Sequence, residues 1–179
     1  MSSMILGISG SPRKDANTDR MVQAVLSAAR KQGSQTEFVR LYDIHLKPCV
    51  ACESCLKKGT CVLDDDMHQL VARIRQSDLL VLGTPVYWWS ASAGFKTFVD
   101  RWYSPEVRKA LRKKKVVVVI PFADTDEKTA SYTCGSLRTS LDYLGVDLVD
   151  IILSPGTTNP GDVDRKKKVL DRLSQAANL

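Results

Sequence analysis

Five short apolar segments recur along the chain, and segments with helical periodicity alternate with them. The apolar segments cover residues 4–9, 36–41, 78–85, 115–122 and 146–153. Apolar residues repeat at helical intervals near residues 21–29, 64–77, 95–102, 129–144 and 162–177. Strands that alternate with helices pair in parallel, and continuously apolar strands are covered on both faces. The pattern therefore predicts one α/β domain over residues 1–179, with a doubly wound five-stranded parallel sheet in a three-layer α/β/α sandwich.

The composition agrees with one globular domain and narrows the choice of partners. The chain of 179 residues is 44% hydrophobic and 26% charged, which is enough apolar material for a full core. Its net charge is +6, and basic residues gather at 112–116 and 165–169, which we interpret as solvated helix ends and loops. Neither cluster accompanies a nucleic-acid recognition motif, so we expect no nucleic-acid partner. The first ten residues lack the features of a signal peptide or membrane helix, which predicts a cytoplasmic protein with no membrane partner.

The loop after the first expected strand has the residues of an anion site. In doubly wound sheets, ligands bind outside the carboxyl ends of the strands, so we expect the site in the loops after strands one, three and four. The first of these reads SGSPRKDANT, where Ser11, Asn17 and Thr18 supply hydrogen-bonding groups and Asn17 or Thr18 is expected to cap the next helix. Free N–H groups at a helix N-terminus, together with Arg13, suit a phosphate. The loop is neither a P-loop nor a G-x-G-x-x-G turn, which disfavours ATP and a dinucleotide bound in the Rossmann manner.

The loop after the third expected strand carries aromatic residues. It reads TPVYWWSAS, and Pro85, Tyr87 and Trp88 would form a flat apolar wall suited to a planar ring. We expect Trp89 to pack internally or at a subunit interface. A phosphate site and an aromatic wall at one edge of a five-stranded sheet indicate FMN.

Three motifs now carry a family resemblance. GSPRKDANT, CVACESCLKKGTC followed by DDM, and PVYWWSAS are similar to motifs of the iron–sulfur flavoproteins, within the wider group of flavodoxin-fold NAD(P)H-dependent FMN reductases. The resemblance covers residues 4–103, and the remaining third agrees only in its strand–helix pattern. It implies strand order 2-1-3-4-5, either NAD(P)H or a ferredoxin-type protein as the electron donor, and a homo-oligomer, dimer or tetramer, with flavins near subunit interfaces. It also implies that the FMN phosphate is held by Ser11, Arg13, Asn17 and Thr18. The isoalloxazine and ribityl chain would be lined by Pro85, Val86, Tyr87, Trp88 and Ser90. The chain departs from many relatives after strand four, where the acidic residues 124–127 replace a glycine-containing loop.

Four of the five cysteines fall in an expected insertion over residues 47–62. They are Cys49, Cys52, Cys55 and Cys61. In a reducing compartment, such a cluster is more often a metal site than a disulfide framework. The C-x2-C-x2-C run offers three thiolates for a [4Fe–4S] cluster, and Gly59 would let the chain turn so that Cys61 supplies the fourth. The compact motif of the iron–sulfur flavoproteins is similar. Zinc and free thiols remain alternatives, and Cys134 is expected to be a small buried hydrophobe.

These features predict an FMN-dependent oxidoreductase or electron-transfer flavoprotein that carries a [4Fe–4S] cluster. A redox partner protein or a small molecule would accept the electrons. We assign no catalytic residue, because the flavin carries the chemistry. One alternative is an NAD(P)H-dependent FMN or quinone reductase whose cysteines are free or bind zinc. A second is a non-enzymatic flavodoxin-like carrier, which the basic pI near 9.1 disfavours because such carriers tend to be acidic. A flavin-free regulatory domain with zinc is a third.

Overall fold

The structure is a computed structural model that describes residues 2–177. A five-stranded parallel sheet has the order β2-β1-β3-β6-β7, which confirms the predicted order 2-1-3-4-5 of the main strands. These strands are β1 (Met4–Ser9), β2 (Gln35–Arg40), β3 (Leu79–Gly83), β6 (Lys115–Pro121) and β7 (Asp147–Ser154). Two short strands, β4 (Val86–Tyr87) and β5 (Ser90–Ala91), pair separately in an antiparallel hairpin.

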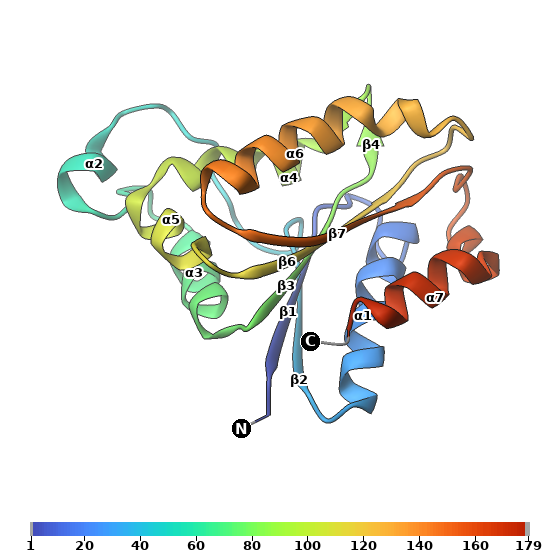
Figure 1. Cartoon of the computed structure of the whole chain (residues 1–179). Helices are drawn as coiled ribbons and strands as arrows, with labels where there is room; N and C mark the ends of the chain where they lie inside the picture. Colours follow the sequence, from blue (N-terminus) through green and yellow to red (C-terminus); the bar gives the residue numbers. More distant parts are fainter. Residues whose placement is uncertain (1, 178–179) are drawn as a thin grey trace.

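Helices cover both faces of the sheet, which confirms the three-layer sandwich (Figure 1). They are α1 (Asn17–Lys31), α2 (Ser54–Lys58), α3 (Met67–Gln76), α4 (Ala93–Asp100), α5 (Pro105–Leu111), α6 (Ser131–Tyr143) and α7 (Lys167–Gln175). Three short 3-10 helices accompany them: η1 (Arg101–Tyr103), η2 (Glu127–Ala130) and η3 (Asp162–Arg165). Helices α1 and α7 pack on one face, while α3, α4, α5 and α6 pack on the other. No helix within residues 2–177 is long and apolar enough to span a membrane.

The strands divide their side chains between two apolar cores. Along β1, Leu6 and Ile8 face α3 and α4, whereas Ile5 faces α1, because successive strand residues point to opposite faces. All three side chains are fully buried. Since every interior strand is covered on both sides, the free edge for a ligand is the row of loops at the carboxyl ends of the strands.

Close backbone packing brings the first and third of these loops together. A Cβ atom on Gly10 would lie 2.5 Å from the Cβ of Phe95 on α4, so only glycine lets the first loop approach that helix. The Ser92 hydroxyl, which caps α4, also donates to the Gly10 carbonyl. The first loop and the β4–β5 hairpin are therefore held as neighbours.

Local structure differs from the expectation in several places. The pattern at 162–177 was predicted as one helix, but the chain forms η3 and then α7, with Lys166 in a non-helical conformation between them. The loop after β3 folds back as the β4–β5 hairpin, and residues 105–111 form the additional helix α5. Two-residue strands and a seven-residue helix are too short to show a clear hydrophobic period.

Candidate functional site

A cavity of about 270 Å³ opens at the carboxyl ends of the strands. Four loops build it: those after β1, β3, β6 and β7. Its lining residues are Ser11, Arg13, Ala16, Asn17, Thr18, Pro85, Val86, Tyr87, Pro121, Phe122, Ala123, Thr157, Thr158 and Pro160. Seven of the nine residues predicted to hold a flavin therefore line one cavity, and the exceptions are Trp88 and Ser90.

The N-terminus of α1 supplies hydrogen-bond donors at one end of this cavity. Ala16 is the N-cap and offers no side-chain cap, so the prediction that Asn17 or Thr18 caps the helix was wrong. Within residues 2–177, the N–H groups of Asn17 and Thr18 have no recorded acceptor, as is usual for the first turn of a helix. Such groups and the helix dipole favour an anion.

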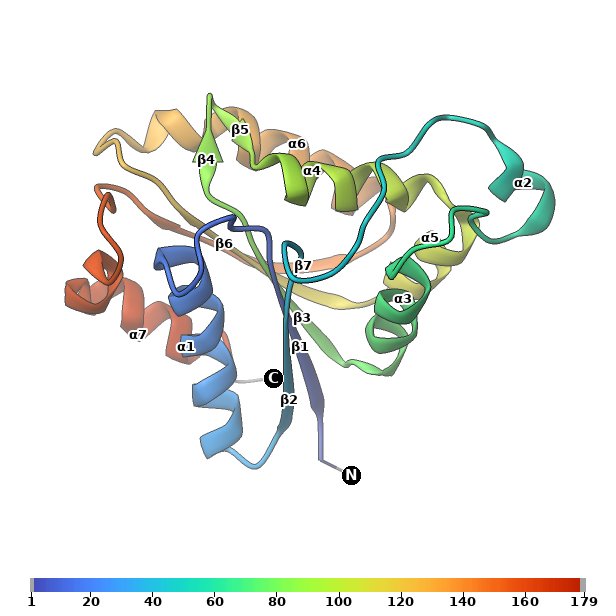
Figure 2. The same ribbon diagram turned by 180° about the vertical axis from the view of Figure 1, so that it is seen from behind.

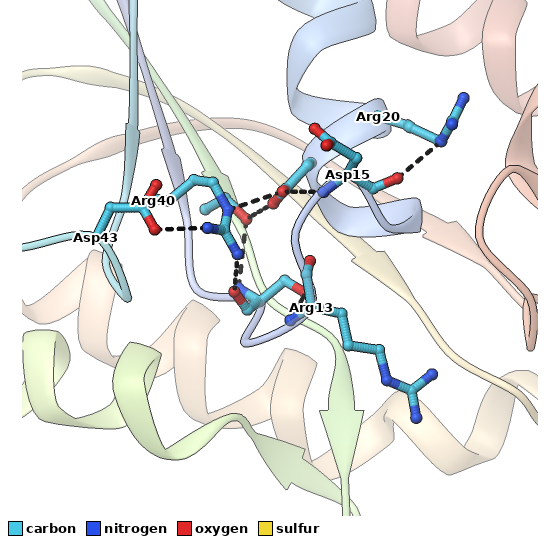
Figure 3. Close-up of polar contacts among 8 residues, drawn as sticks. Arg13, Asp15, Arg20, Arg40 and Asp43 are labelled. Carbon is cyan, nitrogen blue, oxygen red and sulfur yellow. Dashed lines mark hydrogen bonds and ion pairs between the residues drawn. The ribbon is translucent and has the colours of Figure 1, made fainter.

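Arg13 adds a positive charge to the same end. Its side chain is exposed, lines the cavity and makes no recorded ion pair or hydrogen bond within residues 2–177. Figure 3 shows its guanidinium extending from the loop without a dashed contact, in contrast to that of Arg40. The hydroxyl of Ser11 is used within the loop, since it accepts from the Arg13 N–H at 3.1 Å. A guanidinium without a protein partner is free to bind a phosphate.

A buried ion pair, which sequence reasoning missed, fixes the loop from behind. Arg40 at the end of β2 donates from Nε to Asp19 Oδ2 at 2.9 Å, and the side chains are 7% and 3% exposed. Asp19 also accepts from the hydroxyl of Ser9 at 2.5 Å and from the N–H of Asp15 at 2.9 Å. Arg40 Nη2 donates to the carbonyl of Ser11 at 3.2 Å (Figure 3). These contacts hold both ends of the loop on the sheet.

Asn17 lies at the cavity wall, but its side-chain amide is already occupied. Nδ2 donates to the carbonyl of Asn159 at 2.9 Å, and Oδ1 accepts from the N–H groups of Gly161 at 3.1 Å and Val163 at 3.2 Å. These partners lie in the loop after β7 and at the start of η3. The structure thus places the Asn17 backbone N–H, rather than its side chain, where it is free for a ligand.

The aromatic loop forms a flank of the cavity and a projecting tip. Tyr87 and Val86 line the cavity, whereas Trp88 and Trp89 occupy the turn of the β4–β5 hairpin with positive φ angles of 49° and 57°. Trp88 is 88% exposed and Trp89 51%, so Trp89 is not packed inside the chain. Both line an adjoining hollow that shares Val86, Phe122 and Ala123 with the main cavity. Ser90 pairs with Tyr87 in the hairpin and lines neither.

The acidic segment 124–127 is folded against itself. The Asp124 carboxylate accepts from the Asp126 N–H at 3.0 Å and from the Thr129 hydroxyl at 2.7 Å, and these two hydrogen bonds lower the pKa of Asp124. The Asp124 carbonyl also accepts from the Gly156 N–H at 2.6 Å. The loop after β6 is therefore joined to the loop after β7, and it brings Phe122 to the cavity.

Thr157, Thr158 and Pro160 were not predicted as site residues. They follow β7 in the sequence PGTTNPG. The signal was present, because this Gly- and Pro-rich turn ends a strand at the same edge as the other loops. The expected strand order also places the last strand next to the fourth.

The cysteine segment does not reach the cavity. No residue of 47–62 lines it, and Figure 2 shows α2 beyond the end of α4 that lies opposite the hairpin. Cys49 and Cys52 are exposed, Cys61 is half-buried and Cys55 is buried. Within residues 2–177, no group of three or more His, Cys, Asp or Glu side chains could hold a metal ion. Within the described part of the chain, the four thiols therefore do not converge on a common metal position.

A second buried ion pair closes the base of the cysteine segment. Arg101 Nη1 lies 2.5 Å from Asp65 Oδ2, with side chains 1% and 0% exposed. Arg101 also donates to the Lys47 carbonyl at 2.9 Å, and Asp65 accepts from the Lys47 N–H at 2.9 Å. The two ends of the segment are thus fixed, with Cys61 beside Arg101 and Cys55 buried, whereas Cys49 and Cys52 are exposed. The remaining cysteine, Cys134, is partly buried against the core, and burial raises the pKa of its thiol.

The fold and the cavity together define a flavodoxin-like α/β protein with an anion-binding end and an aromatic flank. Residues 3–149 match the NADPH-dependent FMN reductase family. The chain belongs to this family of flavin-dependent oxidoreductases, which confirms the resemblance seen in the motifs. FMN fits the cavity, because the helix N-terminus and Arg13 suit its phosphate while Tyr87 and Phe122 suit a ring.

Relatives with similar sequences fall into two groups. The chain is 37% identical over 110 residues to the iron–sulfur flavoprotein MJ1083 of Methanocaldococcus jannaschii, which covers 62% of this chain and 57% of the relative. It is 25% identical over 175 residues to the putative NAD(P)H-dependent FMN-containing oxidoreductase YwqN of Bacillus subtilis, which covers 94% of this chain and 93% of the relative. The chain spans only about half to three fifths of the length of the iron–sulfur flavoproteins that it resembles.

Solved structures with this fold include an NAD(P)H:quinone oxidoreductase from Methanothermobacter marburgensis. It superposes with a TM-score of 0.76 at 20% identity, over 99% of this chain and 95% of that one. At this identity the likeness establishes the fold.

Proposed function

We propose that the protein is an FMN-dependent oxidoreductase that takes reducing equivalents from NAD(P)H. The observation that carries the proposal is the single cavity that joins the uncapped N-terminus of α1 and Arg13 to the aromatic hairpin. Membership of the NADPH-dependent FMN reductase family supports it, as does the name of the Bacillus subtilis relative that matches nearly the whole chain.

The polar end of the cavity binds and orients the phosphate. The N–H groups of Asn17 and Thr18 donate to its oxygens, and the Arg13 guanidinium adds a charge-assisted contact. Arg40 and Asp19 keep the loop in the geometry that these donors need. Bound FMN supplies the hydride chemistry, so this site needs no general acid or base from the chain.

The apolar end positions the ring system. Pro85, Val86 and Tyr87 flank one side of the cavity, and Phe122 lies on another. Trp88 borders the adjoining hollow, where it excludes water from the ring edge. We place Ser90 in the support of the hairpin rather than in contact with the ring, because it lines neither cavity.

Flavin titration tests the phosphate assignment. FMN and riboflavin differ only in the phosphate, so the apoprotein should bind FMN far more tightly than riboflavin. Flavin fluorescence follows both titrations. Arg13→Gln should lose about tenfold in FMN affinity, equal to one charge-assisted hydrogen bond, and little in riboflavin affinity. Arg30→Gln is the matched control, because it removes the same charge from the other end of α1. Equal affinity of the wild type for the two flavins would contradict the proposal.

Turnover tests the activity. The FMN-loaded protein should oxidise NADH or NADPH under anaerobic conditions with a quinone as acceptor. If the protein binds FMN but oxidises neither nucleotide, it is an electron carrier rather than an NAD(P)H-dependent reductase.

A [4Fe–4S] cluster on Cys49, Cys52, Cys55 and Cys61 remains a separate part of the proposal. The names of the iron–sulfur flavoproteins that match the chain support it, and the unconverged thiols weigh against it. Iron, zinc and sulfide analysis of anaerobically purified protein decides whether the four cysteines carry a cluster. About four irons and four sulfides per chain would support the cluster. Their absence would leave a reductase with free or zinc-bound cysteines.

We also propose a homo-oligomer. Exposed aromatic side chains at the hairpin tip and on α6 support it, namely Trp88, Trp89, Tyr132 and Tyr143. Light scattering of the purified protein would give the subunit number, and a monomer at micromolar concentration would refute this part.

A further inference from the structure

The loop after β7, residues 155–163, forms a wall of the cavity that the family match does not include. The match ends at residue 149, whereas Thr157, Thr158 and Pro160 line the cavity. This wall faces the N-terminus of α1 across the polar end. A ligand held by the first loop therefore lies within reach of a segment outside the family match.

Asn17 connects the two walls. The residue is only 6% exposed, and its side chain makes three hydrogen bonds to this wall. Nδ2 donates to the Asn159 carbonyl, and Oδ1 accepts from the N–H groups of Gly161 and Val163. A buried amide with its donor and acceptor both satisfied is well placed to fix a loop, because loss of either contact leaves a desolvated group.

The loop is also ordered from within. Asp162 Oδ2 accepts from the N–H groups of Thr158 at 2.9 Å and Asn159 at 2.7 Å. The hydroxyl of Thr157 donates to the Ser154 carbonyl at 2.9 Å. In contrast, the exposed Thr158 hydroxyl has no recorded partner within residues 2–177. The backbone of Thr158 is thus fixed while its hydroxyl is free at the cavity.

We propose that residues 155–163 form a fourth ligand-binding wall, that Asn17 holds this wall in place as a positioning residue, and that Thr158 donates its hydroxyl to the phosphate or ribityl oxygens of FMN. The identity of the ligand rests on the proposed function. The anchoring by Asn17 does not, because all of its contacts exist without a ligand.

Hydrogen exchange of the ligand-free protein tests the anchoring. In Asn17→Ala, the amides of Gly161 and Val163 lose their acceptor, so exchange in a peptide over 155–166 should accelerate by about tenfold. Asn17→Asp is the comparison variant, because a carboxylate still accepts from both amides but cannot donate to the Asn159 carbonyl, so exchange should rise less than in Asn17→Ala. If Asn17 served only as a phosphate ligand, neither variant would change exchange in this peptide, and the anchoring would be refuted.

Flavin affinity tests the wall. Asn17→Ala should lower the affinities for FMN and for riboflavin by similar factors, because the whole wall loosens. Asn17→Asp should weaken FMN much more than riboflavin, because it places a negative charge at the phosphate end. Thr158→Val keeps the shape and removes the hydroxyl, so it should lower FMN affinity by about fivefold with loop exchange unchanged.

The outcomes separate the two proposals. Unchanged FMN affinity in Thr158→Val overturns its ligand contact, even if the wild type binds FMN. A wild type that binds neither flavin overturns the proposed function and the Thr158 contact together. In that case the exchange of the Asn17 variants still decides whether this residue anchors the loop.

Discussion

The buried ion pair of Asp19 and Arg40 predicts a large and local stability effect. In Asp19→Asn, the guanidinium of Arg40 stays buried but loses its buried charged partner and keeps only Asp43, a 58% exposed carboxylate 2.6 Å from Nη1. The Asp19 carboxylate also accepts from Ser9 and Asp15, so the substitution weakens three contacts at once. The loop between β1 and α1 then loses part of its attachment to the end of β2.

The magnitude follows from burial. Removing one partner of a buried pair costs about 3–5 kcal/mol, because the remaining charge is desolvated and uncompensated. Asparagine keeps one acceptor oxygen and Asp43 still pairs with Arg40, so we expect the lower end, about 3 kcal/mol. The pair of Arg20 and Asp164 belongs to the same region, but its side chains are 42% and 48% exposed. Exposed pairs contribute about 0–1 kcal/mol, so Arg20→Gln is the matched control.

Urea unfolding of the ligand-free variants at neutral pH, followed by circular dichroism, measures both effects. Asp19→Asn should lower the free energy of unfolding by at least about 2 kcal/mol more than Arg20→Gln. The double variant Asp19→Asn with Arg40→Gln should lose less than the sum of the single variants, because it leaves no buried unpaired charge and only the exposed Asp43 loses a partner. If Asp19→Asn is no more destabilising than Arg20→Gln, burial of this pair does not govern the stability of the loop.

Three further predictions concern other parts of the chain. Asp65→Asn should cost about 3 kcal/mol in a thermal melt, because it leaves the buried Arg101 unpaired, and a shift of less than about 2 °C would refute this. Burial opposes ionisation of Asp65, but hydrogen bonds from Arg101 and the backbone outweigh it and lower its pKa below the ordinary 3.8. Its contribution is therefore complete above the unfolded pKa and is lost as the pH falls through the folded one, so below about pH 4 the wild type should lose stability more steeply than Asp65→Asn. Trp88→Asn should stabilise the ligand-free protein by about 1 kcal/mol, since asparagine tolerates positive φ, and should weaken flavin binding; a loss of stability would contradict the strain at the hairpin turn.

The architecture was predictable because each buried strand carries its own signal. Segments such as 115–122 are apolar throughout, and this pattern belongs to a parallel sheet covered on both faces. The first and third loops were predictable as cavity walls as well, because polar and aromatic residues directly follow buried strands. Strand order then places both loops at one edge.

Contacts between distant side chains were not predictable. Asn17 resembles a helix cap in the sequence, and nothing local indicates that Asn159, 142 positions later, accepts its amide proton. The Asp19–Arg40 pair spans 21 positions and has no sequence period. The hairpin was missed for a different reason, since Trp88 and Trp89 occupy turn positions that asparagine and glycine usually fill.

The cysteine segment shows a limit of spacing arguments. The spacing of Cys49 to Cys61 is compatible with a cluster, yet the thiols of this arrangement do not converge. Spacing constrains which ligands a flexible segment can bring together, but the energy of the metal–ligand bonds decides whether it does so.

A crystal structure of the complex with FMN tests the central claim most directly. The account predicts the phosphate at the N-terminus of α1, with oxygens at hydrogen-bond distance from the Thr18 N–H and the Arg13 guanidinium. It also predicts the isoalloxazine beside Tyr87. A phosphate located away from α1, or a ring on the far side of the sheet from the β4–β5 hairpin, would contradict it.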